Sequence, residues 1–510
     1  MKLFSKVLLI SVAVCSTLVL AVEDDQSKAS NSTKDDTSNA TKKQDQDTDQ
    51  KLPNPLCASC TCDAPQKTFK CSSMKLSSKL FNTTGWASLN DSGLAVDVML
   101  LDRNGITEVP VFPNLDVRVL DLSHNNISVI AKKAFFALSK LEVLDLSYNM
   151  LTTKSLVPAV FEGPYSADDY EPLGQLRVLR LGYNQLHSLD ADLFEHMPNL
   201  QELSLVSNVF KTIDTLTENA LSSVRTLLSL DLSYMELNSV PGGFLNAIGD
   251  LTHLNLTGNL LETIPEGLRF AQKLKWLSLD ENPVGNIQGD HVFPALKSLE
   301  YLSLSYMSPL KVIGRGAFSG LQALQEVHIS NNPVLSYLHV DAFAREDPDD
   351  PTRQNWPRVK RFYLHNNNLS SLDAQLLTHW AEMELVDIRQ NPWNCDCDNQ
   401  WLVETLVPVI EKTTPNTLNN IVCASPPQMA GQSMVELQHK HSQLRCGDKY
   451  GNNPAGDGAL LIGLLIGVLA GIPLTAAVIL IYRRGCFGLV RRGPADYSRA
   501  FYSRATNDDF

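Results

Sequence analysis

The sequence predicts an α/β solenoid, in which short parallel strands form one curved, concave sheet, followed by a single transmembrane helix. Three observations lead to this fold class. An eleven-residue motif rich in leucine recurs between about residues 96 and 393, asparagine returns at its ninth place, and two groups of four cysteines flank the motif copies with none among them. A repeated unit with closed ends is typical of a solenoid with capped termini.

The motif reads Leu-x-x-Leu-x-Leu-x-x-Asn-x-Leu, which is the pattern of the leucine-rich repeat. Val117 to Ile127 and Leu141 to Leu151 are clear copies. Most copies begin 21 to 27 residues apart, a period typical of this repeat. An amphipathic helix or a coiled coil is the alternative, but the leucine spacing is 3-2-3 rather than 3-4. The ninth places are Asn104, Asn125, Asn149, Asn184, Asn208, Met235, Asn259, Asn282, Met307, Asn332, Asn367 and Asn391.

The pattern also predicts how each copy folds. The first, fourth, sixth and eleventh places point inward, and the fourth and sixth belong to a strand whose alternate residues face opposite ways. A single copy cannot enclose that apolar face, so the copies stack and share one core. The ninth-place asparagine turns inward and hydrogen-bonds backbone groups. We expect looser turns at Met235 and Met307, because methionine cannot make these bonds.

Charge and cysteine content limit the function. The net charge is -13, and no basic cluster is dense enough to follow a phosphate backbone, which argues against nucleic acid as a partner. Cysteines gathered in even groups behind a leader segment indicate disulfides formed in an oxidising compartment. Zinc coordination by the first four, Cys57, Cys60, Cys62 and Cys71, is the alternative.

The N-terminal part divides into three segments. Residues 1–21 carry two lysines and then an apolar run, which predicts a signal peptide, with a retained signal anchor as the alternative. Residues 22–56 are polar and acidic and predict a disordered stalk with glycosylation sequons at Asn31 and Asn39. Residues 57–95 predict a cysteine-rich cap over the open end of the solenoid.

The repeat array spans residues 96–390, and two connections within it are unusually long. They are residues 161–172 and 344–357, both acidic and containing proline. We interpret them as loops that bulge from the side opposite the strands or from a rim. Whether they bind a ligand or are inert stays open.

The C-terminal part predicts a second cap, a membrane span and a tail. Residues 391–446 hold Cys395, Cys397, Cys423 and Cys446, and residues 447–458 form a linker. Residues 459–482 carry no charge over 24 positions, enough to span a bilayer, and Arg483, Arg484, Arg491 and Arg492 follow directly at the start of the tail, residues 483–510. The signal peptide and this span together predict a single-pass type I protein of the plasma membrane with an extracellular repeat array.

Three further features of this part are expectations. Gly463, Gly467 and Gly471 line one face of the span, which suggests a homodimer, although glycine is also common in membrane helices. Cys486 lies beside the membrane and is a candidate for palmitoylation. Phe510 ends the chain with a carboxylate that a PDZ domain could bind as an added strand.

Residues between the inward leucines project from the concave sheet and are the candidates for ligand binding. Aromatic and arginine side chains on a rigid surface are typical of protein interfaces. The alternative is that tyrosine at the eighth place is simply common in this repeat. The candidates are Tyr148, Tyr183, Tyr234 and Tyr306 at the eighth place, Trp276 and Tyr301 at the third, Tyr363 at the fifth, and Arg361.

Asn255 lies in a sequon at the fifth place, so a glycan there would obstruct the middle of the concave sheet. It would leave a ligand the flanks, the rims or the convex side. The other sequon asparagines are Asn82, Asn90, Asn126 and Asn368. No motif of a hydrolase, metalloprotease or phosphate-binding enzyme occurs. We therefore expect no catalytic activity, no metal and no cofactor.

The segment from Cys57 to Cys446 resembles the extracellular leucine-rich-repeat proteins with cysteine caps, and its caps are most similar to those of trophoblast glycoprotein. The likeness rests on Cys60-x-Cys62-x8-Cys71 and on NPWNCDC, followed by Cys423 and Met429. The tail and the number of repeats differ. The resemblance implies disulfides Cys57–Cys62, Cys60–Cys71, Cys395–Cys423 and Cys397–Cys446. It also implies a role in adhesion or in modulating Wnt signalling.

Three functions follow as hypotheses. The first is a cell-surface recognition or adhesion protein that binds an extracellular or cell-surface protein. The second is a modulator or co-receptor for a secreted signalling ligand. The third is a structural glycoprotein that spaces cells apart.

Overall fold

A computed structural model describes residues 55–82, 86, 95–163, 172–289, 292–347, 349–350, 353–378, 383–446 and 455–484. The predicted signal peptide, nearly all of the predicted stalk with Asn31 and Asn39, and Asn90 lie outside these residues. So do the predicted tail after Arg484, with Cys486 and Phe510, and most of the first long connection.

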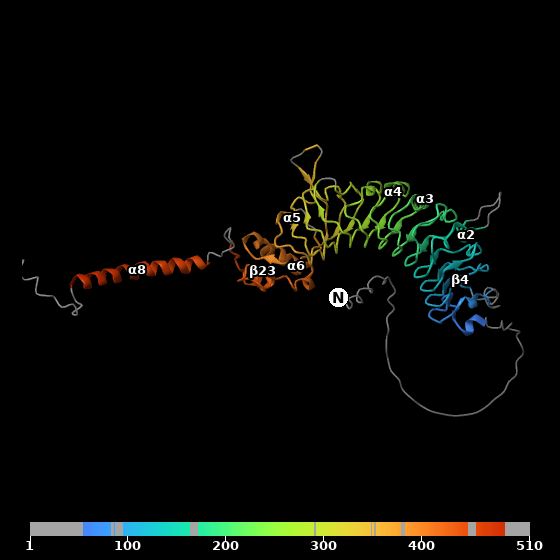
Figure 1. Cartoon of the computed structure of the whole chain (residues 1–510), viewed down its shortest axis with the longest axis horizontal. Coiled ribbons are helices and arrows are strands. Elements are labelled where there is room, and N and C mark those ends of the chain that lie inside the picture. The colour runs from blue at the N-terminus through green and yellow to red at the C-terminus, as the bar shows by residue number, and fades with distance from the viewer. Residues whose placement is uncertain are drawn as a thin grey trace, which may run out of the picture. The chain divides into compact units, whose positions relative to one another are not determined.

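One fourteen-stranded sheet runs along the repeat array and lines the inner side of its arc (Figure 1). From β2 onward every neighbouring pair is parallel, and the hydrophobic residues at the fourth place, most of them leucines, stay in register from strand to strand. Twelve of the strands, β3 to β21, correspond to the twelve predicted copies. The strands are β1 Thr61–Asp63, β2 Thr68–Lys70, β3 Val98–Leu100, β5 Val119–Asp121, β7 Val143–Asp145, β8 Val178–Arg180, β9 Glu202–Ser204, β10 Ser229–Asp231, β11 His253–Asn255, β12 Trp276–Ser278, β14 Tyr301–Ser303, β16 Glu326–His328, β20 Arg361–Tyr363 and β21 Leu385–Asp387.

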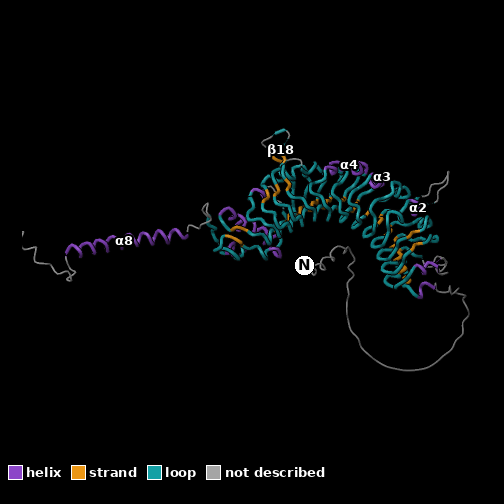
Figure 2. The backbone as a smooth tube through the Cα atoms, viewed as in Figure 1, coloured by secondary structure: helices purple, strands orange, loops and turns teal. Residues whose placement is uncertain are grey.

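The outer side of the arc consists mostly of loops and short elements (Figure 2). Because these occupy more width than single strands, the array curves with the sheet on the inside. The outer helices are α2 Pro158–Phe161, α3 Thr215–Ser223, α4 Gly242–Ala247, η3 Glu266–Phe270 and α5 Gln375–Thr378. The outer strands are β4 Glu108–Val109, β6 Val129–Ile130, β13 Asn286–Ile287, β15 Val312–Ile313 and β17 Tyr337–Leu338.

The core is a continuous column of inward leucines, as the motif predicts. In the third copy, for example, Leu141, Leu144, Leu146 and Leu151 are each at most 1% exposed. A second column of phenylalanines lies between the leucines and the outer side. Phe112, Phe135 and Phe161 stack with centroids 6.0 and 5.8 Å apart. The sequence analysis did not identify this column, although its members follow each motif at a similar distance.

The ninth-place asparagines tie each turn to the one before. The Asn125 amide nitrogen donates to Leu101 O of the preceding copy and to Leu122 O of its own, both at 3.0 Å, and its Oδ1 accepts from Asn104 N at 3.1 Å. Met235 is fully buried and fills this space without those bonds. Beside it Phe210 N bonds Asn208 O instead, which locally rearranges the turn.

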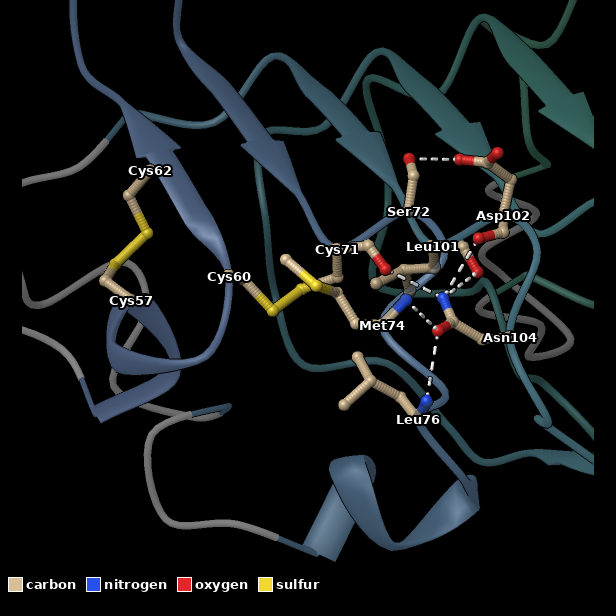
Figure 3. Close-up of a disulfide and its surroundings, with 10 residues drawn as sticks. All are labelled: Cys57, Cys60, Cys62, Cys71, Ser72, Met74, Leu76, Leu101, Asp102 and Asn104. Atoms are coloured by element: carbon tan, nitrogen blue, oxygen red, sulfur yellow. Dashed lines mark hydrogen bonds between the residues drawn. A yellow bond between two sulfur atoms is a disulfide. The ribbon is translucent and has the colours of Figure 1, made fainter.

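Disulfides close both ends of the array. Cys57 pairs with Cys62 and Cys60 with Cys71 in the N-terminal cap, next to η1 Pro55–Ala58 and η2 Ser78–Asn82. Figure 3 shows Asn104 bonding Cys71 O at 2.8 Å and the amides of Met74 and Leu76, so the first repeat holds the cap in place.

The C-terminal cap is built around Trp393, which is fully buried and donates to Ile388 O at 3.0 Å. Disulfides join Cys395 to Cys423 and Cys397 to Cys446. The cap's elements are β22 Trp393–Asn394, η4 Cys397–Asn399, η5 Leu402–Leu406, α6 Val407–Thr413, η6 Pro415–Thr417, β23 Cys423–Ser425 and α7 Met434–His439.

The second long connection contains structure that its composition did not suggest. β18 Arg345–Glu346 pairs antiparallel with β19 Gln354–Asn355, and this hairpin projects from the outer side of the arc (Figure 2). After the C-terminal cap, α8 Ala455–Arg484 includes residues Leu460–Ile481 with a mean hydropathy of 2.7, long and apolar enough to cross a membrane.

The concave face as the candidate functional site

Third- and fifth-place side chains project from every strand of the sheet onto the concave face. The fourth-place residue between them is buried, as in β14, where Leu302 is fully buried. Parallel strands lie about 4.8 Å apart, so equivalent places in successive copies form rows along the face. The side chains in each row therefore determine the chemistry of the concave face.

Five rings form one row across the C-terminal half of this face, and we name it the aromatic row. The Trp276 and Tyr301 centroids lie 5.2 Å apart with the ring planes at 12°, and those of His328 and Tyr363 lie 4.1 Å apart at 18°. The ring centroids of Tyr301 and His328 lie 5.0 Å apart, which connects these two pairs. The members are His253, Trp276, Tyr301, His328 and Tyr363.

The structure thus brings together three predicted residues, Trp276, Tyr301 and Tyr363, and adds two histidines that sequence reasoning missed. His253 stands at the third place and His328 at the fifth, so tabulating both outward places would have found them. Tyrosine, tryptophan and histidine rings each combine apolar carbon with a polar atom, so the row can offer a ligand both kinds of contact.

An ion pair flanks the aromatic row at β16 and β20. Arg361 Nε donates to Glu326 at 2.8 Å, and His328 Nε2 lies 2.7 Å from the same carboxylate. Burial alone would raise the pKa of Glu326, but the hydrogen bonds from Arg361 and His328 outweigh it and lower this pKa. Arg361 therefore forms an ion pair with Glu326 on the neighbouring strand, and its side chain also lies exposed on the concave face.

A second charged cluster closes the row at its C-terminal end. Asp387 is 2% exposed and accepts from Arg389 Nε at 2.8 Å and Nη2 at 2.6 Å, with His365 Nδ1 at 3.2 Å. Burial opposes ionisation, but these bonds lower the pKa of Asp387 well below its usual range. The carboxylate is charged at neutral pH and anchors Arg389 and His365 beside the aromatic row.

Burial also raises the pKa of Tyr301 to about 12, helped by the charge of Asp280. Asp280 accepts from Ser303 Oγ and Ser305 N, both at 2.6 Å. Tyr301 is therefore a neutral hydroxyl under all physiological conditions. It supplies a hydrogen bond rather than a charge.

The eighth-place residues lie at the rim of the sheet and share one backbone conformation. All twelve have positive φ, from +53° at Arg103 to +68° at Gly258. Two of the predicted tyrosines stack there, Tyr148 on Tyr183 at 3.9 Å and 9°, and His124 continues the stack at 4.0 Å. Burial and the hydrogen bond with Tyr183 raise the pKa of Tyr148 to about 12.

Tyr234 and Tyr306, the other predicted rim tyrosines, do not belong to that stack. The Tyr234 ring covers Gly258, so closely that a Cβ there would lie 2.3 Å from the ring, and its hydroxyl donates to Glu281 at 2.9 Å. Gly258 is required to make room for this ring, since other residues occupy the same φ in neighbouring copies. Tyr306 is 57% exposed.

The N-terminal half of the concave face carries ion pairs in place of rings. Arg180 lies between Asp145 at 3.7 Å and Glu202 at 3.1 Å. Asp145 also accepts from Ser147 N at 2.9 Å, and Asp121 and Asp231 bond the serines two residues on in the same way. Each of these aspartates therefore stabilises a local turn.

Comparison with known proteins matches this architecture. The leucine-rich repeat family matches residues 116–164, 174–234, 225–284 and 272–334. Together with the parallel sheet, this match shows that the array of this chain is built from leucine-rich repeats.

Several known leucine-rich-repeat proteins are similar to this chain. Tsukushi of Gallus gallus is 29% identical over 57% of this chain and 73% of its own length. FLRT2 of Mus musculus, a leucine-rich-repeat transmembrane protein, is 29% identical over 44% of this chain but only 35% of its own length. CD180 antigen of Mus musculus is 26% identical over 59% of this chain and 38% of its own length.

Solved leucine-rich-repeat structures are also similar. A leucine-rich-repeat protein of Leptospira interrogans is 24% identical, with a TM-score of 0.45 over 61% of this chain and 70% of that one. An octameric complex of latrophilin 3, Unc5D and FLRT2 contains a chain that is 21% identical, with a TM-score of 0.36 over 74% of this chain and 95% of that one. The specific likeness to trophoblast glycoprotein stays a prediction.

The remaining predicted sites lie apart from the aromatic row or at its edge. Asn126 and Asn368 are exposed at turns, and Asn82 ends η2. Asn255 is half-buried in β11, two residues from His253, and its Oδ1 accepts from Thr257 N at 3.1 Å. In α8 the Cβ positions of Gly463, Gly467 and Gly471 meet no described atom within 4 Å. Their role in a dimer stays a prediction.

Proposed function

We propose that this chain is a cell-surface recognition protein that binds an extracellular protein through the C-terminal half of its concave face, without catalysis. The observation that carries the proposal is the aromatic row. Interface energy is concentrated in a few aromatic and arginine side chains held in fixed positions, and the row supplies five aromatic or imidazole rings beside Arg361. Stacking holds the rings in place before a ligand arrives, which lowers the entropy cost of binding.

The relatives support a binding role. Tsukushi, FLRT2 and CD180 antigen are leucine-rich-repeat proteins of the secreted or cell-surface type. A type I arrangement at the plasma membrane is part of the proposal, with α8 as the single span. The proposed recognition role has two forms, adhesion and the modulation of a secreted ligand such as a Wnt protein. A structural spacer is the competing role.

A glycan on Asn255 would limit the proposed site at one end and would not block it. Asn255 pairs with Asp231 in β10 and Ser278 in β12, while the aromatic row extends from β11 toward the C-terminus. A sugar there would separate the row from the N-terminal half of the face. We therefore expect Asn255→Gln to leave ligand binding intact.

The test is a binding screen with the full chain displayed on cells against secreted and cell-surface ectodomains. For any ligand found, Trp276→Ala and Tyr301→Ala should each weaken binding at least about tenfold, since central anchors contribute more than about 1 kcal/mol. Trp276→Phe keeps a stacked ring and should weaken binding less.

Tyr148→Ala and Tyr183→Ala remove a similar stack from the N-terminal rim and serve as matched controls. We expect them to change affinity by less than about threefold. Thermal unfolding of each variant separates loss of binding from loss of folding. Binding that depends on the rim stack and tolerates Trp276→Ala would place the site elsewhere, and the absence of any ligand would favour the spacer.

A further inference from the structure

A groove of about 660 Å³ lies along one side of the array, beside the C-terminal half of the sheet. Four cationic side chains line it, and we name it the basic groove. Its other lining residues are polar, buried or small, apart from the half-buried Trp356. The cations are Lys275, Lys297, Arg358 and Lys360.

The backbone of the repeats builds one wall of the basic groove. Second-place residues of successive copies are linked by hydrogen bonds, from Glu300 N to Lys275 O at 2.9 Å, Gln325 N to Glu300 O at 2.8 Å and Lys360 N to Gln325 O at 2.8 Å. Three strand spacings therefore separate Lys275 from Lys360, about 14 Å. The wall is a straight row, which suits an extended ligand.

The charge of the basic groove is largely uncompensated. Among the described residues that line it, Glu300 is the only carboxylate, and it pairs with Lys275 at 3.2 Å. Within the described part of the chain, Lys297, Arg358 and Lys360 belong to no ion pair. The equivalent row of the N-terminal half differs, because Arg118 there lies 3.3 Å from Asp97 and 3.9 Å from Glu142. In a chain of net charge -13, the groove thus brings three unpaired cations together.

We propose that the basic groove binds a sulfated polysaccharide. Lysine and arginine bind sulfate as they bind phosphate, by charge and hydrogen bonds. The exposed Gln325 and the partly exposed Ser298 add hydrogen-bonding groups that suit sugar hydroxyls. An acidic protein would also need an apolar anchor pocket, and this groove is lined mainly by polar side chains. Disulfide-bonded caps place the array in a compartment where sulfated polysaccharides are abundant polyanions.

The inference is independent of the aromatic row, because second-place residues lie at the side of the sheet and third-place residues on its concave face. A polysaccharide here would leave the aromatic row accessible to a protein. The two sites can therefore be tested separately with different variants.

The test measures binding of the full chain to immobilised heparin, to chemically desulfated heparin and to phosphatidylserine vesicles. The triple variant Lys297→Gln, Arg358→Gln, Lys360→Gln should lower heparin affinity at least about tenfold near physiological salt. The slope of log affinity against log salt concentration should become less negative by about two to three, because each contact that is neutralised contributes close to one unit to this slope.

The matched control replaces three exposed lysines elsewhere, Lys70→Gln, Lys132→Gln and Lys154→Gln, for which no ion pair is described. The control should keep heparin affinity within about twofold, and both variants should keep the wild-type unfolding midpoint. Equal loss in both variants would show that only net charge matters and overturn the proposal. Binding to desulfated heparin as strong as to heparin, or binding to vesicles alone, would also overturn it.

Discussion

The two halves of the concave face have the same backbone and different chemistry. β5, Val119–Asp121, and β14, Tyr301–Ser303, each have a buried leucine between two outward residues, and both pair in parallel with their neighbours. The outward residues are ion-paired or turn-forming in the N-terminal half, whereas the C-terminal half adds a row of five stacked rings beside its ion pairs. The difference teaches that outward places are free to vary because the inward places alone satisfy the core.

The largest expected effect tests whether the core is common to both halves. Leu120→Ala in β5 and Leu302→Ala in β14 each remove a fully buried side chain. Both should lower the free energy of unfolding by about 2–5 kcal/mol through lost burial and the cavity left behind. Denaturant unfolding measures this.

The outward neighbour of Leu120 is the matched control. Val119→Ala trims a partly exposed side chain of the same strand and should cost less than about 1 kcal/mol. If the two leucine variants differed by several kcal/mol, the halves would not share one continuous core.

An intermediate effect is expected at Asp387, a buried carboxylate that pairs with both Arg389 and His365. Asp387→Asn should cost about 1–3 kcal/mol at pH 7, because Arg389 and His365 lose a charged partner. The folded pKa of Asp387 is lowered, so its contribution is present above the unfolded value of about 4 and is lost as pH falls below it. The difference in the free energy of unfolding between the wild type and Asp387→Asn should therefore become smaller as the pH falls below about 4.

Asp145→Asn, at the same fifth place in β7, is the control for that measurement. Asparagine can still accept the bonds from Ser147, so the cost should stay below about 1 kcal/mol. A gap at Asp387 that is independent of pH would contradict the assigned ion pairs.

The smallest effect lies at the junction of the two halves, where Tyr234 covers Gly258. Gly258→Ala should cost about 1–2 kcal/mol because the new Cβ displaces the ring. In the background Tyr234→Ala the same change should cost clearly less, a coupling that a double-mutant cycle measures.

Ser207→Ala, at the same place with φ of +55°, changes no such contact and should be nearly neutral. Additive costs for Gly258→Ala and Tyr234→Ala would show that backbone strain, not the ring, accounts for the glycine.

Several features of the fold followed from the motif alone. The spacing of leucines and asparagines predicted the parallel strands, their number and the inward places, because those residues each solve a local problem of burial or backbone bonding. The rest depended on contacts that the motif does not encode. The phenylalanine column and the contact of His365 with Asp387 join neighbouring copies, whereas the β18–β19 hairpin forms within one connection.

The candidate site divides in the same way. Trp276, Tyr301, Tyr363 and Arg361 could be assigned to the concave face from their places in the motif. That three of them stack with His253 and His328, while Arg361 pairs with Glu326, could not be assigned, because ring stacking depends on side-chain orientation. The turn-forming role of Asp121 and Asp145 was hidden for the same reason.

The sequence by itself determined that this chain forms a leucine-rich solenoid with cysteine caps and a hydrophobic segment long enough to cross a membrane. Periodicity and composition suffice for that, since burial of a repeated apolar face has one regular solution. Only the tertiary structure decided which outward side chains meet as an aromatic row and which cations remain unpaired in the basic groove. Those properties depend on distances across neighbouring turns, and successive turns are separated by more than twenty residues of chain.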